Sequence, residues 1–342
     1  MNMMKAIVVE QSGSPEVLHI RQIHRPEPDN GWVLVRIRAF GLNRSEMFTR
    51  QGFSPDVTFP RILGIEAVGE VEQDPSGHYQ AGQKVAAVMG GMGRQYNGGY
   101  AEYAVLPLER LMPLQTTVSW EILGAIPEMF LTVWSSLTES LDIQAGQTLL
   151  VRGGTSSIGL TSVAVAKNAG LTVLATTRSE KKKQALLDAG ADHVLIDDGN
   201  IAEKVRTIFP KGVDRIQELV GTRTLLDSLQ ATAPKGVVCM TGMLGNEWSL
   251  ANFEPMMIPS SVKLTTYQSE TLDMSTAVSA LQEYVTGVEH GTYTVRLDRV
   301  FKFDEIVEAH RYMESNAATG KLVVLVDEIS KADERWRILS NA

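Results

Sequence analysis

The stretch Thr148-Leu-Leu-Val-Arg-Gly-Gly-Thr-Ser-Ser-Ile-Gly159 decides the fold. A short apolar strand, Thr148–Arg152, runs into a glycine-rich turn, and the turn runs into a helix expected over 158–169. Gly170 follows, and glycine just past a helix accepts the left-handed cap conformation at little cost. A strand, a tight turn and a helix in this order predict the first unit of a parallel sheet covered by helices.

Working outward, strands and helices alternate after Trp120. Further strands are expected at 172–176, 194–196, 215–220, 237–241 and 264–267, with helices at 180–189, 201–209 and 223–231. This alternation predicts a Rossmann-type, doubly wound parallel sheet. The chain before Trp120 is instead strand-rich, with strands expected at 6–9, 18–23, 33–39, 65–71 and 84–88, and residues 293–327 return to mixed strand and helix.

The glycine turn predicts a dinucleotide site. A diphosphate needs close backbone approach and free amides at a helix N-terminus, where the helix dipole favours negative charge. Gly154 permits the tight turn and Gly159 permits close packing of helix on strand, whereas Ser156 replaces the middle glycine of the usual pattern. We expect the turn to bind the cofactor through its six consecutive residues Gly154, Thr155, Ser156, Ser157, Ile158 and Gly159.

The end of the second strand favours NADPH over NADH. NAD-binding folds usually place an acidic residue about 20 positions past the glycine motif. Nineteen positions past Gly159 stands Arg178, after Thr177 and before a run of lysines that includes Lys182. A guanidinium and a hydroxyl suit a 2′-phosphate, although Glu180 in the same run is a contrary sign.

Composition excludes several classes of partner and site. The 342 residues are 44% apolar and 21% charged, with a net charge of -8, so a nucleic-acid backbone is not an expected partner. Cys239 is the single cysteine and cannot form an internal disulfide. No run approaches the roughly 18 apolar residues of a membrane span, and no secretory signal is evident, so we expect a cytoplasmic protein.

Five motifs resemble, in their order, the landmarks of the medium-chain dehydrogenase/reductase superfamily. They are Gly41–Phe48, Gly64–Gly69, Thr132–Trp134, the glycine turn and Gly320–Val323. The resemblance implies a GroES-like β-rich catalytic domain over 1–121, a Rossmann NADP-binding domain over 122–271, and a C-terminal segment over 272–342 that completes the first domain and carries a polar tail from 330.

Within the superfamily, the sequence resembles the zinc-free quinone oxidoreductase branch. Zinc-dependent relatives have a catalytic cysteine and a histidine where this chain has Asn43 and Ile65, so no metal is expected. The resemblance implies that Asn43 faces the nicotinamide, that Thr132 and Lys321 contact the cofactor, and that Lys182 contacts the 2′-phosphate. It also implies that Thr241, Gly242 and Met243 lie against the nicotinamide.

These features predict hydride transfer from NADPH to a small quinone or α,β-unsaturated carbonyl. Asn43, Glu46 and Tyr96 are the candidate catalytic residues. Tyr96 or Tyr100 could donate a proton, or each could only pack within its loop. Glu46 and Glu66 could instead have a structural role. The alternatives are an enoyl-thioester reductase, a zinc-type alcohol dehydrogenase, and a non-catalytic NADPH sensor. The apolar edge strand at 264–267 predicts a homodimer.

Overall fold

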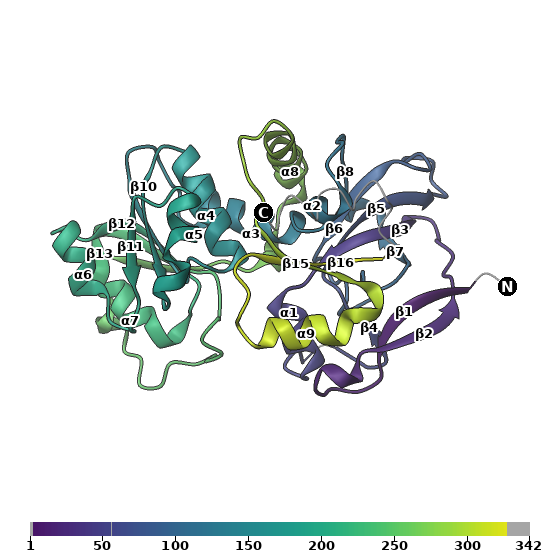
Figure 1. Cartoon of the computed structure of the whole chain (residues 1–342), viewed down its shortest axis with the longest axis horizontal. Coiled ribbons are helices and arrows are strands. Elements are labelled where there is room, and N and C mark those ends of the chain that lie inside the picture. The colour runs from purple at the N-terminus through teal and green to yellow at the C-terminus, as the bar shows by residue number, and fades with distance from the viewer. Residues whose placement is uncertain (1–2, 56, 327–342) are drawn as a thin grey trace. The chain divides into compact units, whose positions relative to one another are not determined.

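A computed structural model describes residues 3–55 and 57–326 of the chain, so the predicted tail from residue 330 lies outside the described residues. The chain divides into two compact units (Figure 1). Unit 1 comprises residues 1–128 with 273–342, and unit 2 comprises 129–272. The first boundary between the units, at 128/129, lies seven residues after the boundary expected at 121/122. The chain up to Glu128 stays with unit 1, where the Glu128 amide donates a hydrogen bond to Glu66 at 2.9 Å.

Unit 2 contains a six-stranded sheet of parallel strands in the order β11-β10-β9-β12-β13-β14. The strands are β9 (Thr148–Arg152), β10 (Thr172–Thr177), β11 (His193–Ile196), β12 (Val213–Glu218), β13 (Thr232–Met240) and β14 (Lys263–Thr266). Because β9 lies between β10 and β12, the order reverses there. Such a switch point is where ligands bind at the carboxyl ends of the strands.

Helices cover both faces of this sheet. Along β9, Leu149 and Val151 pack with one set of helices, whereas Leu150 packs with the other set. The first set is α3 (Pro127–Ser135), the π-helical turn η3 (Ser136–Ser140), α4 (Ser157–Asn168) and α5 (Lys183–Asp188); the second is α6 (Ala202–Ile208) and α7 (Thr222–Ala231). Three 3₁₀ turns complete the unit: η4 (Glu180–Lys182), η5 (Pro255–Met257) and η6 (Ser269–Thr271). The predicted doubly wound sheet is confirmed.

Unit 1 is β-rich. A seven-stranded sheet runs in the order β15-β16-β3-β5-β6-β8, with β7 also paired to β3, and a smaller sheet runs β2-β1-β4. The strands are β1 (Met3–Val9), β2 (His19–His24), β3 (Trp32–Gly41), β4 (Arg61–Ile62), β5 (Glu66–Gln73), β6 (Lys84–Val88), β7 (Tyr103–Pro107), β8 (Leu111–Pro113), β15 (Leu297–Lys302) and β16 (Lys321–Leu325). The C-terminal strand β16 pairs with β3, so the end of the described chain completes the N-terminal sheet.

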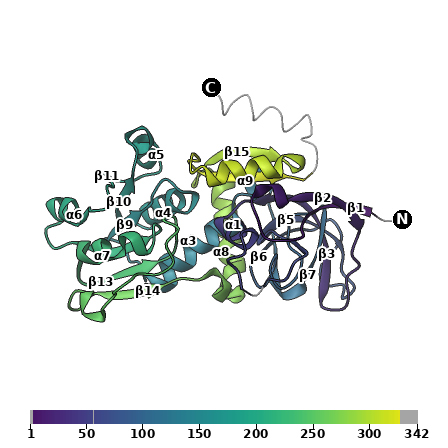
Figure 2. The same ribbon diagram turned by 90° about the horizontal axis from the view of Figure 1, so that it is seen from below.

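Four helices of the described residues belong to this unit, and α9 lies beside β15 in both views of the chain (Figures 1 and 2). The helices are α1 (Arg44–Arg50), α2 (Trp120–Leu123), α8 (Met274–Glu289) and α9 (Ile306–Glu314), with 3₁₀ turns η1 (Pro15–Val17), η2 (Leu108–Arg110) and η7 (Phe303–Glu305). None of the helices in residues 3–55 and 57–326 is both long enough and apolar enough to cross a membrane.

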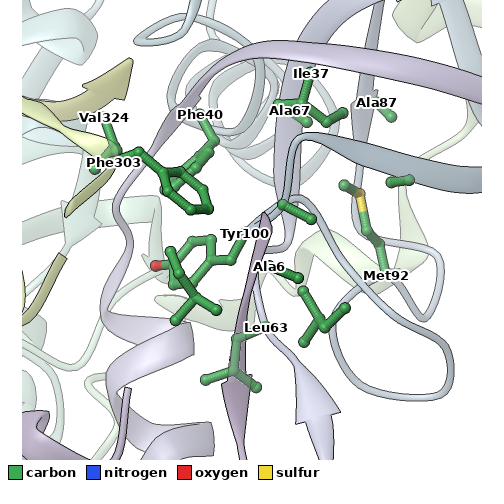
Figure 3. Packing of buried hydrophobic residues seen from close by; sticks show 14 of the residues in the cluster. Ala6, Ile37, Phe40, Leu63, Ala67, Ala87, Met92, Tyr100, Phe303 and Val324 are labelled. Atoms are coloured by element: carbon green, nitrogen blue, oxygen red, sulfur yellow. The ribbon is translucent and has the colours of Figure 1, made fainter. Parts of the chain in front are cut away.

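The core of unit 1 is built on a stack of aromatic rings (Figure 3). Phe40 on β3 stacks on Tyr100 with ring centroids 4.5 Å apart, and Phe303 meets Phe40 edge-on at 6.5 Å. Such pairs add roughly 0.5–1.5 kcal/mol to the burial of the rings. The stack joins β3, the glycine-rich loop at 89–100 between β6 and β7, and the C-terminal segment, and it lies next to Gly41 in the sequence.

Candidate functional site

The glycine turn of unit 2 has the geometry that a diphosphate needs. A Cβ on Gly159 would lie 2.5 Å from the carbonyl oxygen of Gly154, so only glycine lets α4 approach the turn this closely. Residues 155–158 are partly exposed. The first amides of α4 have no preceding helical turn to accept their hydrogen bonds. The residues present therefore fit a bound dinucleotide phosphate.

Ser156 is the N-cap residue of α4. Its Oγ accepts a hydrogen bond from the amide of Gly159 at 3.1 Å and donates one to the carbonyl of Gly153 at 3.0 Å. The serine that replaces the middle glycine thus closes the turn on itself, as an N-cap residue does. The hydroxyl is engaged by the protein, so backbone amides are the groups left for a phosphate.

The end of β10 presents the predicted recognition residues. Thr177 is buried, and its Oγ1 accepts the amide of Ser179 at 3.2 Å, which bends the chain directly after the strand. Arg178 is exposed at that bend, and Lys182 is partly buried on η4. The guanidinium of Arg178 makes no hydrogen bond or ion pair within residues 3–55 and 57–326, so it is available to an anion.

The other residues predicted to bind the cofactor lie in both units. Thr132 is a buried residue of α3, and Thr241, Gly242 and Met243 follow β13 and are partly buried, so all four belong to unit 2. The amides of Thr241 and Gly242 donate to the carbonyl of Glu218, which fixes the loop to the end of β12. Lys321 belongs to unit 1.

A buried polar cluster in unit 1 joins Lys321 to Asn43 and Glu66. The Lys321 Nζ donates to Asn43 Oδ1 at 2.6 Å and to Glu66 Oε1 at 2.7 Å, and Asn43 Nδ2 donates to Glu66 Oε1 at 2.9 Å. Gly41 makes room for the cluster, since a Cβ there would lie 2.3 Å from Glu66 Oε1 and 2.4 Å from Lys321 Cε. The cluster holds a direct ion pair that is closed off from water, and the amide of Asn43 contacts both of its charges.

Glu46 is the fourth member of this polar cluster. Its Oε2 accepts the backbone amide of Asn43 at 3.1 Å, and its Oε1 accepts the amide of Ile65 at 3.1 Å and Asn43 Nδ2 at 3.3 Å. Burial raises the pKa of Glu46 to about 7, and the charge of Glu66 adds to the rise, while the amide hydrogen bonds and Lys321 oppose it. The raised pKa lets this carboxyl keep its proton to a higher pH than an exposed glutamate would.

The contacts of Asn43 restrict what its side chain can do. The Nδ2 hydrogens are directed at Glu66 and Glu46, and the Oδ1 accepts from Lys321, while the residue remains partly exposed. Besides Lys321, the backbone amide of Glu46 is directed at this side chain, in the capping box that begins α1. The amide of Asn43 is therefore fixed by the cluster and has no hydrogen left to donate.

The structure does not bring Tyr96 into the polar cluster. Its ring meets Trp32 edge-on at 5.3 Å, and Trp32 begins β3, whereas Gly41 ends it. Burial raises the pKa of Tyr96 to about 12. A different residue of the same loop, Arg94, donates to Ser45 Oγ at 2.5 Å, and Ser45 lies between Asn43 and Glu46 in the sequence.

Sequence reasoning missed two features of these sites. It assigned Lys321 to the cofactor and did not anticipate its ion pair with Glu66. It also passed over Arg152, which is fully buried at the end of β9. A signal was present in both cases, because each cation lies inside or at the end of an apolar run, Gly320–Leu325 or Leu149–Arg152. Such a cation is expected to be buried, and a buried charge almost always has a partner of opposite charge.

Two family models match the chain. The alcohol dehydrogenase GroES-like domain matches residues 29–116, and a domain described as zinc-binding dehydrogenase matches residues 189–324. The first match agrees with the β-rich sheets of unit 1, so the predicted GroES-like domain is confirmed. For the second, no group of three or more His, Cys, Asp or Glu side chains able to hold a metal occurs in the part of the chain that the structure describes. The absence of zinc stays a prediction.

Whole-chain relatives agree with these matches. A human quinone oxidoreductase is 27% identical over 331 residues, which cover 95% of this chain and 98% of the relative. A quinone oxidoreductase of Pseudomonas aeruginosa is 27% identical over 329 residues, covering 94% and 100%. A mycobacterial protein solved in complex with NADPH superposes with a TM-score of 0.85 at 26% identity, covering 94% and 100%. The chain therefore belongs to the medium-chain dehydrogenase/reductase superfamily, in its quinone oxidoreductase-like branch, and is an oxidoreductase.

Proposed function

We propose that this oxidoreductase uses NADPH to reduce a small quinone or α,β-unsaturated carbonyl without a metal. The exposed Arg178 at the end of β10 is the observation that carries the choice of cofactor, because a guanidinium there suits a 2′-phosphate and would not replace a ribose-binding carboxylate. The names of the relatives, and the NADPH complex of one structural neighbour, support the reaction class.

NADPH, when bound, supplies the hydride and so carries the hard chemistry. The chain's own residues bind and orient it. The amides at the start of α4 and the close approach at Gly154 and Gly159 would hold the diphosphate. Arg178 and Lys182 would hold the 2′-phosphate, while Thr132 and the segment Thr241–Met243 are proposed on the nicotinamide side.

For Asn43 we propose a cofactor-orienting role. The residue is partly exposed and its amide is fixed by Lys321, Glu46 and Glu66, so it would offer a rigid surface for a bound carboxamide, whereas its Nδ2 hydrogens already serve Glu66 and Glu46. An oxyanion developing on the acceptor needs a donor, and Asn43 has none to give. Lys321, Glu66 and Glu46 would then act as positioning residues for this amide, and proton donation by Tyr96 stays a prediction.

The experiment that tests the proposal compares R178A with wild type. We expect the KM for NADPH to rise about ten- to a hundred-fold, the worth of a lost charge-assisted hydrogen bond, with the KM for NADH unchanged. The acceptors are 1,4-benzoquinone, 9,10-phenanthrenequinone and an enoyl thioester, on metal-free protein. The matched control is K183A, an exposed cation on the same segment. Equal losses with NADPH and NADH would contradict the role of Arg178.

The same assay separates the alternatives. Turnover with the enoyl thioester alone would favour an enoyl-thioester reductase. Saturable NADPH binding without turnover of any acceptor would favour a sensor. Stoichiometric zinc in the purified protein by elemental mass spectrometry would favour the zinc-type dehydrogenase.

We also propose a homodimer formed through β14, the edge strand of the unit 2 sheet, whose outer backbone groups would otherwise offer a template for pairing. Sedimentation velocity at micromolar concentration measures this, and a monomer mass would contradict it. We also propose a cytoplasmic location, since the single cysteine, Cys239, is buried and the chain has no disulfide framework of the kind that small secreted proteins use.

A further inference from the structure

Arg152 is a fully buried cation at the end of β9, directly before the glycine turn. Its Nε and Nη2 donate to the two carboxylate oxygens of Asp197 at 2.9 and 3.0 Å, and its Nη1 donates to Asp227 at 2.7 Å and to Ser228 Oγ at 3.0 Å. The carbonyl of Gly199 accepts the second hydrogen of Nη2 at 3.1 Å, and the carbonyl of Thr224 shares the hydrogens of Nη1 at 3.0 Å. The guanidinium is thus satisfied by partners from the loop after β11 and from α7.

One branch of this network leads to the phosphate turn. The Oδ2 of Asp197 that receives Arg152 Nε also accepts from Thr176 Oγ1 at 3.3 Å. Thr176 Oγ1 in turn accepts the backbone amide of Gly153 at 3.0 Å, and the carbonyl of Thr176 accepts the amide of Gly154 at 2.9 Å. Asp197 therefore links Arg152 to the two glycines that open the turn.

A second branch leads to the loop after β13. Ser228 Oγ, which accepts from Arg152, donates to Glu218 Oε2 at 2.5 Å. Glu218 Oε1 accepts the amides of Val220 and Gly221 at 2.7 and 3.1 Å. A Cβ on Gly221 would lie 2.9 Å from Met243 Sδ, so the loop that Glu218 shapes packs directly on the proposed nicotinamide segment.

We propose that Arg152 is a positioning residue that holds both halves of the dinucleotide site in register, the phosphate turn through Asp197 and the nicotinamide segment through Ser228 and Glu218. The inference rests on the proposed function, because it needs NADPH as ligand. Thr176, Asp197 and Glu218 lie at the carboxyl ends of β10, β11 and β12, the edge where ligands bind in such sheets. An apolar residue would fill the same space at lower desolvation cost, so stability alone does not account for the cation.

The test uses the full-length protein and two half-ligands, adenosine 2′,5′-bisphosphate and reduced nicotinamide mononucleotide, with dissociation constants from calorimetry. D197N should raise the dissociation constant of the bisphosphate roughly tenfold or more, because small displacements of a site have effects of this size. It should leave the dissociation constant of the mononucleotide within about twofold of the wild-type value. E218Q should do the reverse. R152K, which keeps the charge and loses the fork of donors, should weaken both.

The matched control is R50K in unit 1. Arg50 is also fully buried and pairs with Glu314, so its replacement tests the loss of a buried guanidinium away from this network. R50K should bind both half-ligands as wild type does. If R152K instead melts at a lower temperature and binds both half-ligands normally, Arg152 serves stability only and the proposal is wrong.

Two further results complete the test. If R152K does not fold, S228A carries the argument, because it removes one hydroxyl and should weaken the mononucleotide alone; unchanged affinity would overturn the second branch. If wild type binds neither NADPH nor the bisphosphate, the proposed function itself has failed. Wild-type binding of NADPH combined with unchanged variants overturns the positioning role alone.

Discussion

The ammonium nitrogen of Lys321 lies 2.7 Å from Oε1 of Glu66, and the two side chains are 1% and 0% exposed. They come from β16 and β5, which are not neighbours in the sheet, since β3 lies between them. Burying two charges costs several kcal/mol per ion, which their attraction repays only in good geometry with further hydrogen bonds. Here Asn43 and the amide of Glu128 supply those bonds, so the pair organises the polar cluster as well as neutralising it.

The first prediction concerns this ion pair. K321M leaves Glu66 buried without its cation, so we expect the free energy of unfolding in urea to fall by about 3–5 kcal/mol. The matched control is R21M, which removes the half-exposed pair of Arg21 with Glu10 and should cost at most about 1 kcal/mol. The double variant K321M/E66L should recover part of the loss. Equal losses of unfolding free energy in K321M and R21M would show that the buried pair stabilises the fold no more than the exposed pair does.

Much of unit 2 could be predicted from the sequence because its strands are short apolar runs punctuated by glycines. The expected strand at Thr148–Arg152 coincides with β9, and in unit 1 the expected strand at Lys84–Val88 coincides with β6. The helix expected over 180–189 is instead a 3₁₀ turn followed by α5. The bend that Thr177 Oγ1 makes with Ser179 precedes that turn, and its geometry is not visible in the letters.

Helix α8 (Met274–Glu289) was not predicted, although its signal was present. Its buried residues Ala277, Leu281, Tyr284 and Val285 recur at helical spacing, and Asp273 caps its N-terminus by accepting the amide of Ser275. The intervening serines and threonines, which are poor helix formers, obscured the pattern. Tertiary packing overrides such weak local preferences.

The two candidate sites differ in how much of each could be predicted from the sequence. The glycine turn is local, so its residues and geometry could be expected from a dozen letters. The polar cluster depends on pairing between distant strands, since Lys321 is 255 residues from Glu66 and reaches it only because β16 pairs with β3 in the register that sets Val323 opposite Gly41. Register of this kind follows from the whole sheet and not from a motif.

The second prediction concerns pH and Glu46. Its pKa is raised from 4.5 to about 7 in the folded protein, so the folded state holds the proton more tightly than the unfolded chain. The resulting stabilisation is present in full below about pH 4.5 and is lost as pH rises through about 7. E46Q cannot ionise, so the free energy of unfolding of wild type minus that of E46Q should fall by about 2–3 kcal/mol between about pH 5 and pH 8. A difference independent of pH would contradict the raised pKa.

The third prediction concerns Gly159. A Cβ there would lie 2.5 Å from the carbonyl oxygen and 2.6 Å from the Cα of Gly154, so G159A must push α4 away from the phosphate turn. We expect a loss of about 1–3 kcal/mol in the free energy of unfolding and a clear rise in the dissociation constant for NADPH, measured by fluorescence titration. The matched control is G146A, where the backbone is left-handed at φ 84° but the space is open; it should cost about 1 kcal/mol and leave NADPH affinity unchanged. If both variants bound NADPH as wild type does, the close approach at Gly159 would serve the packing of α4 alone, and the diphosphate would have to be held elsewhere on unit 2.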